Sequence, residues 1–160
     1  AEAYNNIGNA LKDLGKLGKA LEAFEKAILI KPDYAEAYNN KGVILNEQGN
    51  IDEAVFSFKR AIELSPKHAK AYNNLGVALV NQCEIEAAKE TYNKALDITQ
   101  NDAEIYWNYS GTSENISEAK KWLNRCVAVD QDHVMAKLTL SADSRLKMSC
   151  YSLYSLSYHN

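Results

Sequence analysis

Residues 1–34 have the sequence AEAYNNIGNALKDLGKLGKALEAFEKAILIKPDY, and the same pattern begins again at Ala35, Ala69 and Ala103. Glycine, leucine, alanine and aromatic residues all recur in this register. The recurring sets are Tyr4, Tyr38, Tyr72 and Tyr106; Gly8, Gly42 and Gly76; Leu11, Leu45 and Leu79; Ala20, Ala54 and Ala88; Phe24, Phe58 and Tyr92; and Ala27, Ala61 and Ala95. A period of this length is typical of repeat proteins, in which each unit packs on its neighbours.

Each unit predicts two amphipathic helices. Apolar and small residues fall at positions 3, 4, 7, 8, 10, 11 and 14, and a second set runs from residue 17 to residue 30. Both sets have the spacing of one helix face. Gly15 and Gly49 stand where a helix ends on a left-handed residue. Pro32 and Pro66 predict the end of the second helix, because proline cannot continue a helix.

Three of the recurring glycines lie inside the first helix of their unit, where glycine costs about 1 kcal/mol relative to alanine. We therefore expect a partner helix to come too close for a Cβ atom at Gly8, Gly42 and Gly76. The aromatic residues of the second helices are the natural groups to fill this space.

The motif resembles the tetratricopeptide repeat. The residues that carry the resemblance are Tyr4-x-x-Ile7-Gly8-x-x-Leu11, then Ala20-x-x-x-Phe24, Ala27 and Pro32, with matching residues in the second and third units. Lys41 departs from the pattern in place of an apolar residue, and Gln100 departs in place of the closing proline. The resemblance implies an all-α, right-handed solenoid of helical hairpins with about four to five repeats, which binds protein and is not an enzyme.

The register predicts a solenoid over residues 1–136, with repeats 1–34, 35–68 and 69–102 and a shortened repeat 103–133. In the fourth unit Ala119 comes earlier than position 122, where the register would place it, so the first helix should lose about one turn and be followed by a looser connection. Residues 137–160 would form a partial repeat with a capping helix and a tail. Three capping boxes are also predicted, at Asp33-x-x-Glu36, Asn50-x-x-Glu53 and Asn115-x-x-Glu118.

Charge and composition limit the function. The chain has 18 basic and 21 acidic residues and a net charge of −3, which provides no basic surface for a nucleic acid. Its longest apolar run, residues 27–30, is far below the about 20 residues that span a membrane. The cysteines (Cys83, Cys126 and Cys150) and histidines are too scattered for a metal site, and we expect the cysteines to be partly buried thiols. No catalytic or cofactor motif is present, no signal peptide is visible, and a cytoplasmic location is predicted.

Two columns of asparagine recur in the first helices, where asparagine is a poor helix former. One column is Asn6, Asn40, Asn74 and Asn108, and its neighbour is Asn5, Asn39 and Asn73. An amide both donates and accepts hydrogen bonds, so a row of amides can hold the backbone of an extended peptide without reading its sequence. We expect these residues to line a concave groove and bind peptide. The alternative is that they are ordinary polar residues near the start of each helix.

These asparagines resemble those of the superhelical repeats of the O-linked N-acetylglucosamine transferase, where they line the inner groove and hold substrate peptides. The resemblance implies peptide binding at these positions and no transferase chemistry. A second resemblance is to the carboxylate clamp, which binds acidic C-termini of chaperones, and it would use Asn9, Asn40 and Lys70. Asn5 and Asn74 stand where that clamp needs cations, which counts against it.

The sequence therefore predicts an interaction module whose partner is a protein or an extended peptide, with no cofactor, no nucleic acid and no membrane. Two alternatives stay open. The segment could be the substrate-selecting arm of a larger transferase. It could also be a scaffold that self-associates near its C-terminal end, through Tyr106, Trp107, Tyr109 or the tyrosine-rich tail.

Overall fold

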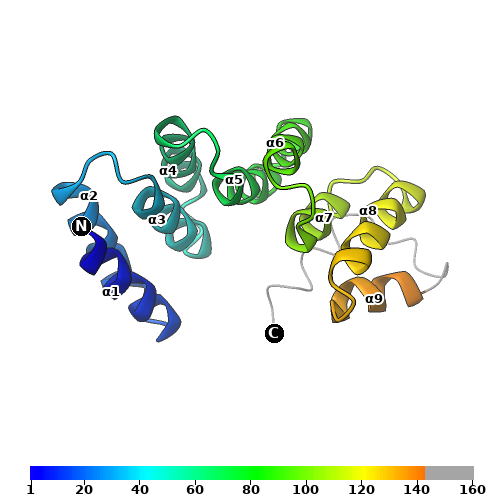
Figure 1. Ribbon diagram of the computed structural model, residues 1–160, viewed down its shortest axis with the longest axis horizontal. Coiled ribbons are helices and arrows are strands. Elements are labelled where there is room, and N and C mark those ends of the chain that lie inside the picture. Colours follow the sequence, from blue (N-terminus) through cyan, green and yellow to red (C-terminus); the bar gives the residue numbers. More distant parts are fainter. Residues whose placement is uncertain (143–160) are drawn as a thin grey trace. The chain divides into compact units, whose positions relative to one another are not determined.

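The computed structural model describes residues 1–142, which form nine helices and no strand (Figure 1). The helices are α1 Glu2–Asp13, α2 Leu17–Ile30, α3 Ala35–Glu47, α4 Ile51–Leu64, α5 Ala69–Asn81, α6 Ile85–Ile98, α7 Ala103–Ser110, α8 Ile116–Val129 and α9 Val134–Ser141. The all-α fold is as predicted, and α3, α5 and α7 begin at the same position of successive sequence units. The tail and Cys150 lie outside the described residues.

The chain forms two compact units, residues 1–91 and residues 92–160, and the division falls inside α6. In the first unit α1 packs on α2, α2 on α3, α3 on α4 and α4 on α5. The first helices of successive hairpins also pack side by side, α1 on α3 and α3 on α5. In the second unit α7 packs on α8 and α8 on α9. The repeat and domain boundaries given above stay predictions.

The two helices of a hairpin are held close at the recurring glycine. A Cβ atom built on Gly8 would lie 2.4 Å from the ring of Phe24, and one built on Gly42 would lie 2.6 Å from the ring of Phe58. Both rings are fully buried. The expectation of a close approach is therefore confirmed at these two positions, and the group that approaches is the expected aromatic ring.

Neighbouring hairpins share a core and an ion pair. Ala20 and Phe24 of the first hairpin pack with Ile44 of the second. At the edge of this core, the Lys41 Nζ atom lies 2.9 Å from the Glu25 Oε1 atom. Lys41, which departs from the apolar residue of the repeat pattern, thus places its ammonium group on a carboxylate of the preceding hairpin.

We predict that Gly42→Ala lowers the free energy of unfolding. Overpacking a core costs about 1–3 kcal/mol, whereas replacing a helical glycine by alanine gains about 1 kcal/mol. The ring of Phe58 is buried and the added methyl would lie well inside contact distance of it. The steric cost should therefore exceed the gain in helix propensity. Chemical denaturation followed by circular dichroism measures the change.

Gly18→Ala is the matched control, because Gly18 lies in α2 and nothing stands within 4 Å of its Cβ position. This variant should be more stable than wild type by up to about 1 kcal/mol. Equal stability of the two variants would show that the ring of Phe58 moves aside.

The turn inside each hairpin of the first unit uses a left-handed residue. The φ angles are 69° at Gly15, 81° at Gly49 and 63° at Cys83. In each turn the amide after this residue donates to the carbonyl five residues earlier, as in a Schellman motif. These bonds are Lys16 to Leu11 at 2.8 Å, Asn50 to Leu45 at 2.9 Å and Glu84 to Leu79 at 2.9 Å. Cys83 thus occupies a glycine position and is exposed, in contrast to the partly buried thiol that we expected.

We predict that Cys83→Gly raises the free energy of unfolding by about 1 kcal/mol, because a left-handed conformation costs a residue with a Cβ atom about 1–2 kcal/mol. Gly49→Ala places the opposite change in the equivalent turn and should lower stability by a similar amount. Thermal denaturation of the two variants beside wild type tests the pair. A neutral effect of both changes would contradict the strain at Cys83.

Two of the three predicted capping boxes are wrong, and the turn geometry explains one of them. Asn50 occupies the N-cap position of α4 but forms no side-chain cap bond. The Asn50 amide bonds to the Leu45 carbonyl in the turn, and this bond holds ψ of Asn50 at 64°. A capping residue has an extended backbone, so Asn50 cannot cap α4 in this conformation. The helix α3 has Tyr34 at its N-cap, so Asp33 stands one position too early.

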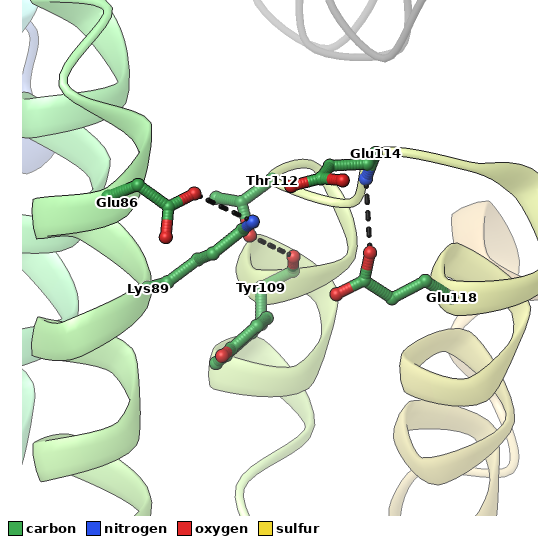
Figure 2. Close-up of polar contacts among 6 residues, drawn as sticks. All are labelled: Glu86, Lys89, Tyr109, Thr112, Glu114 and Glu118. Carbon is green, nitrogen blue, oxygen red and sulfur yellow. Dashed lines mark hydrogen bonds and ion pairs between the residues drawn. The ribbon is translucent and has the colours of Figure 1, made fainter.

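The fourth hairpin is shortened as predicted, but its connection is not loose. The helix α7 has 8 residues against 13 in α5. After α7 the chain is buried at Thr112 and Ser113. The Thr112 hydroxyl donates to the Tyr109 carbonyl at 2.7 Å (Figure 2), and the Ser110 hydroxyl donates to the Trp107 carbonyl at 2.7 Å. Hydroxyl groups thus satisfy the last carbonyls of the short helix.

The third capping residue is confirmed. The Glu118 amide donates to the Asn115 side chain at 2.9 Å, and the backbone of Asn115 is extended. The Glu118 carboxylate accepts from the Glu114 amide at 3.1 Å (Figure 2), one residue before the amide that a standard capping box uses. Elsewhere in the same view, Lys89 pairs with Glu86 within α6 at 2.9 Å.

Aromatic rings form the core of the second unit. The rings of Tyr109 and Trp122 stack at 4.1 Å between centroids, and the Arg125 guanidinium lies 4.9 Å from the Trp122 centroid. Tyr106 and Tyr109 are buried here, so they do not offer the surface for self-association that we considered. Cys126 is also buried, and burial raises the pKa of its thiol to about 11, with a further contribution from Asp130.

Candidate functional site

The asparagine columns of the first unit lie on helices that pack side by side. Asn5 and Asn6 belong to α1, and the corresponding pairs are 39–40 on α3 and 73–74 on α5. Since α1 packs on α3 and α3 on α5, the structure brings these six residues onto neighbouring helices. Asn108 belongs to α7 in the second unit and is 9% exposed.

The column that begins at Asn5 is buried. The exposed fractions are 1% for Asn5, 2% for Asn39 and 2% for Asn73. A side chain with this exposure has almost no surface to offer to a ligand. The expectation that these three residues contact a peptide therefore has no accessible surface to support it.

Hydrogen bonds join the two columns across the boundary between repeats. The Nδ2 atom of Asn40 donates to Oδ1 of Asn5 at 3.0 Å, and Nδ2 of Asn74 donates to Oδ1 of Asn39 at 2.9 Å. Asn39 also donates to Oδ1 of Asn40 at 3.4 Å, near the limit of a hydrogen bond. The side chains of Asn74, Asn39, Asn40 and Asn5 thus form a chain in which each amide donates to the next.

The second column is accessible. Asn6 is exposed, and Asn40 and Asn74 are half-buried. The amides of Asn40 and Asn74 therefore keep one part against the preceding repeat and another part at the surface. We call Asn6, Asn40 and Asn74 the amide row.

The same spacing of 35 residues gives a third bond, two helical turns farther along the first helices. Nδ2 of Asn81 on α5 donates to Oδ1 of Asn46 on α3 at 3.2 Å. The repeat period predicts which residues are equivalent but does not predict this pairing, because the bond joins positions that differ by one residue within their repeats. For the bonds of Asn40 and Asn74, the signal that could have found the pairing is the recurrence of asparagine at two adjacent positions of each unit; Asn46 and Asn81 show no such recurrence.

The two remaining residues predicted to bind peptide lie on α1 and α5. Asn9 is half-buried on α1, and Lys70 is exposed in the first turn of α5. Charges of both signs surround the amide row, with Glu2 on α1, Glu36 on α3 and Lys70 on α5. The region therefore has no strong preference for a charged ligand.

His68 stands beside this region, at the N-cap of α5. Burial lowers its pKa below the ordinary value, while Glu36 raises the pKa and Lys70 lowers it further. The neutral imidazole is therefore favoured in the folded chain relative to the unfolded chain.

We predict that His68 makes the fold less stable in mild acid. The unfolded chain takes up the proton first, so stability falls as the pH drops through the ordinary histidine pKa of about 6.5. His68→Gln should reduce the loss of melting temperature between about pH 7.5 and about pH 5.5. The other histidines are present in both proteins and cancel in the comparison, and identical pH profiles would contradict the shift.

Neither a metal centre nor a membrane-spanning helix is found in the part of the chain that the structure describes. Across residues 1–142, no three side chains of histidine, cysteine, aspartate and glutamate are grouped to hold a metal. No helix in that range combines the length and the apolar character that crossing a bilayer requires.

Three family models, each described as a tetratricopeptide repeat, match residues 1–34, 23–56 and 45–108, which together cover residues 1–108 without a gap. The chain belongs to the tetratricopeptide-repeat family. Tetratricopeptide repeats are generally non-catalytic interaction modules. Comparison with curated proteins found no significant match.

Solved structures confirm the tetratricopeptide fold. A chain of the APC/C hetero-tetramer Cut9–Hcn1 has a TM-score of 0.81 and 21% identity, over 87% of this chain and 29% of that chain. PilF of Pseudomonas aeruginosa has a TM-score of 0.81 and 19% identity, over 88% of this chain and 65% of that chain. The first TPR of Spaghetti (RPAP3), bound to the HSP90 peptide SRMEEVD, has a TM-score of 0.68 and 21% identity, over 72% of this chain and 91% of that chain. This chain spans less than two thirds of the first two.

Proposed function

We propose that this tetratricopeptide chain is a protein-interaction module that binds an extended peptide along α1, α3 and α5. The observation that carries the proposal is the amide row, because Asn6, Asn40 and Asn74 place an accessible amide on each of three neighbouring helices. A peptide backbone presents alternating donors and acceptors, which amides can match.

The mixed charges of the region support a ligand of moderate polarity. Recognition of the backbone supplies affinity, and neighbouring side chains such as Asn9 and Lys70 add selectivity. This binding mode follows the resemblance to the repeats of the O-linked N-acetylglucosamine transferase. The division of the array into repeats belongs to the same proposal, whereas Asn108, which is 9% exposed and lies on α7 of the second unit, stays a prediction from the sequence.

The carboxylate clamp is a weaker candidate for this chain. The first TPR of Spaghetti is bound to an HSP90 peptide. In the present chain Asn5 stands where such a clamp needs a cation, and it is 1% exposed and accepts a hydrogen bond from Asn40. A buried neutral amide cannot provide the charge-assisted bonds that a terminal carboxylate requires. The arm of a larger transferase and the self-associating scaffold remain the alternatives, without an observation that favours them.

The test uses a phage library of random unstructured peptides and the full chain. We predict that wild type enriches peptides whose binding survives alanine replacement at most side chains but is lost when central backbone amides are N-methylated. This outcome follows if amides hold the backbone, and it needs no change in the protein. Isothermal titration with synthetic copies of the enriched peptides measures the affinity.

The matching protein variant combines Asn6→Ala, Asn40→Ala and Asn74→Ala. Three lost hydrogen bonds of about 1 kcal/mol each should weaken binding about 100-fold. Asn50→Ala is the control, since Asn50 is exposed on the same unit and forms no cap bond. Circular dichroism verifies that the variants stay helical. Enriched peptides that bind the triple variant as tightly as wild type would show that binding occurs elsewhere.

A further inference from the structure

We propose that Asn5 and Asn39 are positioning residues, which hold the amides of Asn40 and Asn74 from the preceding repeat. This inference rests on the proposed function of the amide row. It assigns the buried column a separate role, because residues that are 1% and 2% exposed cannot themselves contact a bound peptide.

The geometry of the two bonds is the same. In each case Nδ2 of the accessible asparagine donates to Oδ1 of the buried asparagine 35 residues earlier, at 3.0 Å for Asn40 and 2.9 Å for Asn74. The donor and acceptor ends are therefore not interchangeable in this pairing. Two successive repeat boundaries have the same hydrogen bond, so the bond is a feature of the repeat and does not depend on one local contact.

This bond removes a freedom that would weaken binding. The terminal torsion of an asparagine side chain is broad, so an unheld amide can exchange its donor and acceptor ends. Fixing a side chain before the ligand arrives means that less entropy is lost in the binding step. With Nδ2 held by the preceding repeat, the Oδ1 atoms of Asn40 and Asn74 are left as acceptors, and Oδ1 of Asn40 also accepts a long bond from Asn39 at 3.4 Å.

The role can be separated from a general effect on folding by a thermodynamic cycle. The probe is a synthetic peptide enriched by wild type from the random library, and its Kd is measured with wild type, Asn39→Ala, Asn74→Ala and the double variant. Asn74→Ala should weaken binding about 5- to 10-fold, and Asn39→Ala about 3- to 5-fold. If Asn39 acts through Asn74, the double variant binds no more weakly than Asn74→Ala alone.

Because Asn39 also donates to Asn40 at 3.4 Å, the same cycle is measured for Asn5 and Asn40, whose bond is separate from that contact. Multiplicative losses in the Asn5–Asn40 cycle would overturn the inference, because the buried asparagine would then act independently of the accessible one. An unchanged Kd for Asn39→Ala would also overturn it, while leaving the proposed peptide function intact. Asn50→Ala is again the control, because Asn50 lies in the first unit and forms no cap bond, and its Kd should equal that of wild type. If Asn39→Ala does not fold, Asn5→Ala applies the same cycle to Asn40.

A second readout needs no peptide. In the NMR spectrum of wild type, the side-chain amide protons of Asn74 should exchange slowly with water, because one of them is held by Asn39. Asn39→Ala should raise that exchange rate to the range of the exposed Asn6, with little change at Asn81. No change at Asn74 would refute the positioning role. If wild type enriches no peptide at all, the proposed function fails, and the NMR result still decides whether Asn39 positions Asn74.

Discussion

The close approach of Phe24 to Gly8, and of Phe58 to Gly42, sets the distance between the two helices of a hairpin. Because both hairpins are closed in the same way, each presents the same surfaces to its neighbours, and the first helices α1, α3 and α5 lie side by side. Equivalent residues then recur at a constant step. The asparagine bonds exist because that step is reproduced closely enough for two amides to meet.

Asparagine in these helices has two different environments only one residue apart. Each pair places one amide in the boundary between repeats and the next amide at the surface. A buried polar group needs a partner, and Asn5 and Asn39 find it in the accessible amide of the following repeat. The cost of asparagine inside a helix is thus offset by bonds between repeats, and the same bonds orient the groups that we propose for peptide binding.

The repeat period predicted the helices, their order and the aromatic group at Gly8 and at Gly42, since these depend on positions that recur in every regular unit. The left-handed residues Gly15 and Gly49 were also predicted, but other features that depend on local backbone angles were not. Asn50 has the residue type of a helix cap, but the preceding turn fixes its backbone away from the capping conformation. The buried state of Asn5 was also missed, because a period shows that Asn5 and Asn39 are equivalent and does not show which way they point. Cys83 could have been recognised, since it occupies the position in its unit that Gly49 occupies in the unit before.

The asparagine pair makes each repeat an interchangeable module. A repeat that carries both residues brings a donor for the repeat before it and an acceptor for the repeat after it. Gene duplication could therefore add such a unit between two others, and every rung would still close. The fourth repeat has Trp107 in the position of the acceptor, and an indole nitrogen can only donate. New repeats could therefore be inserted among the first three without loss of these hydrogen bonds. A repeat placed after Trp107 would have no acceptor for the amide of its own asparagine.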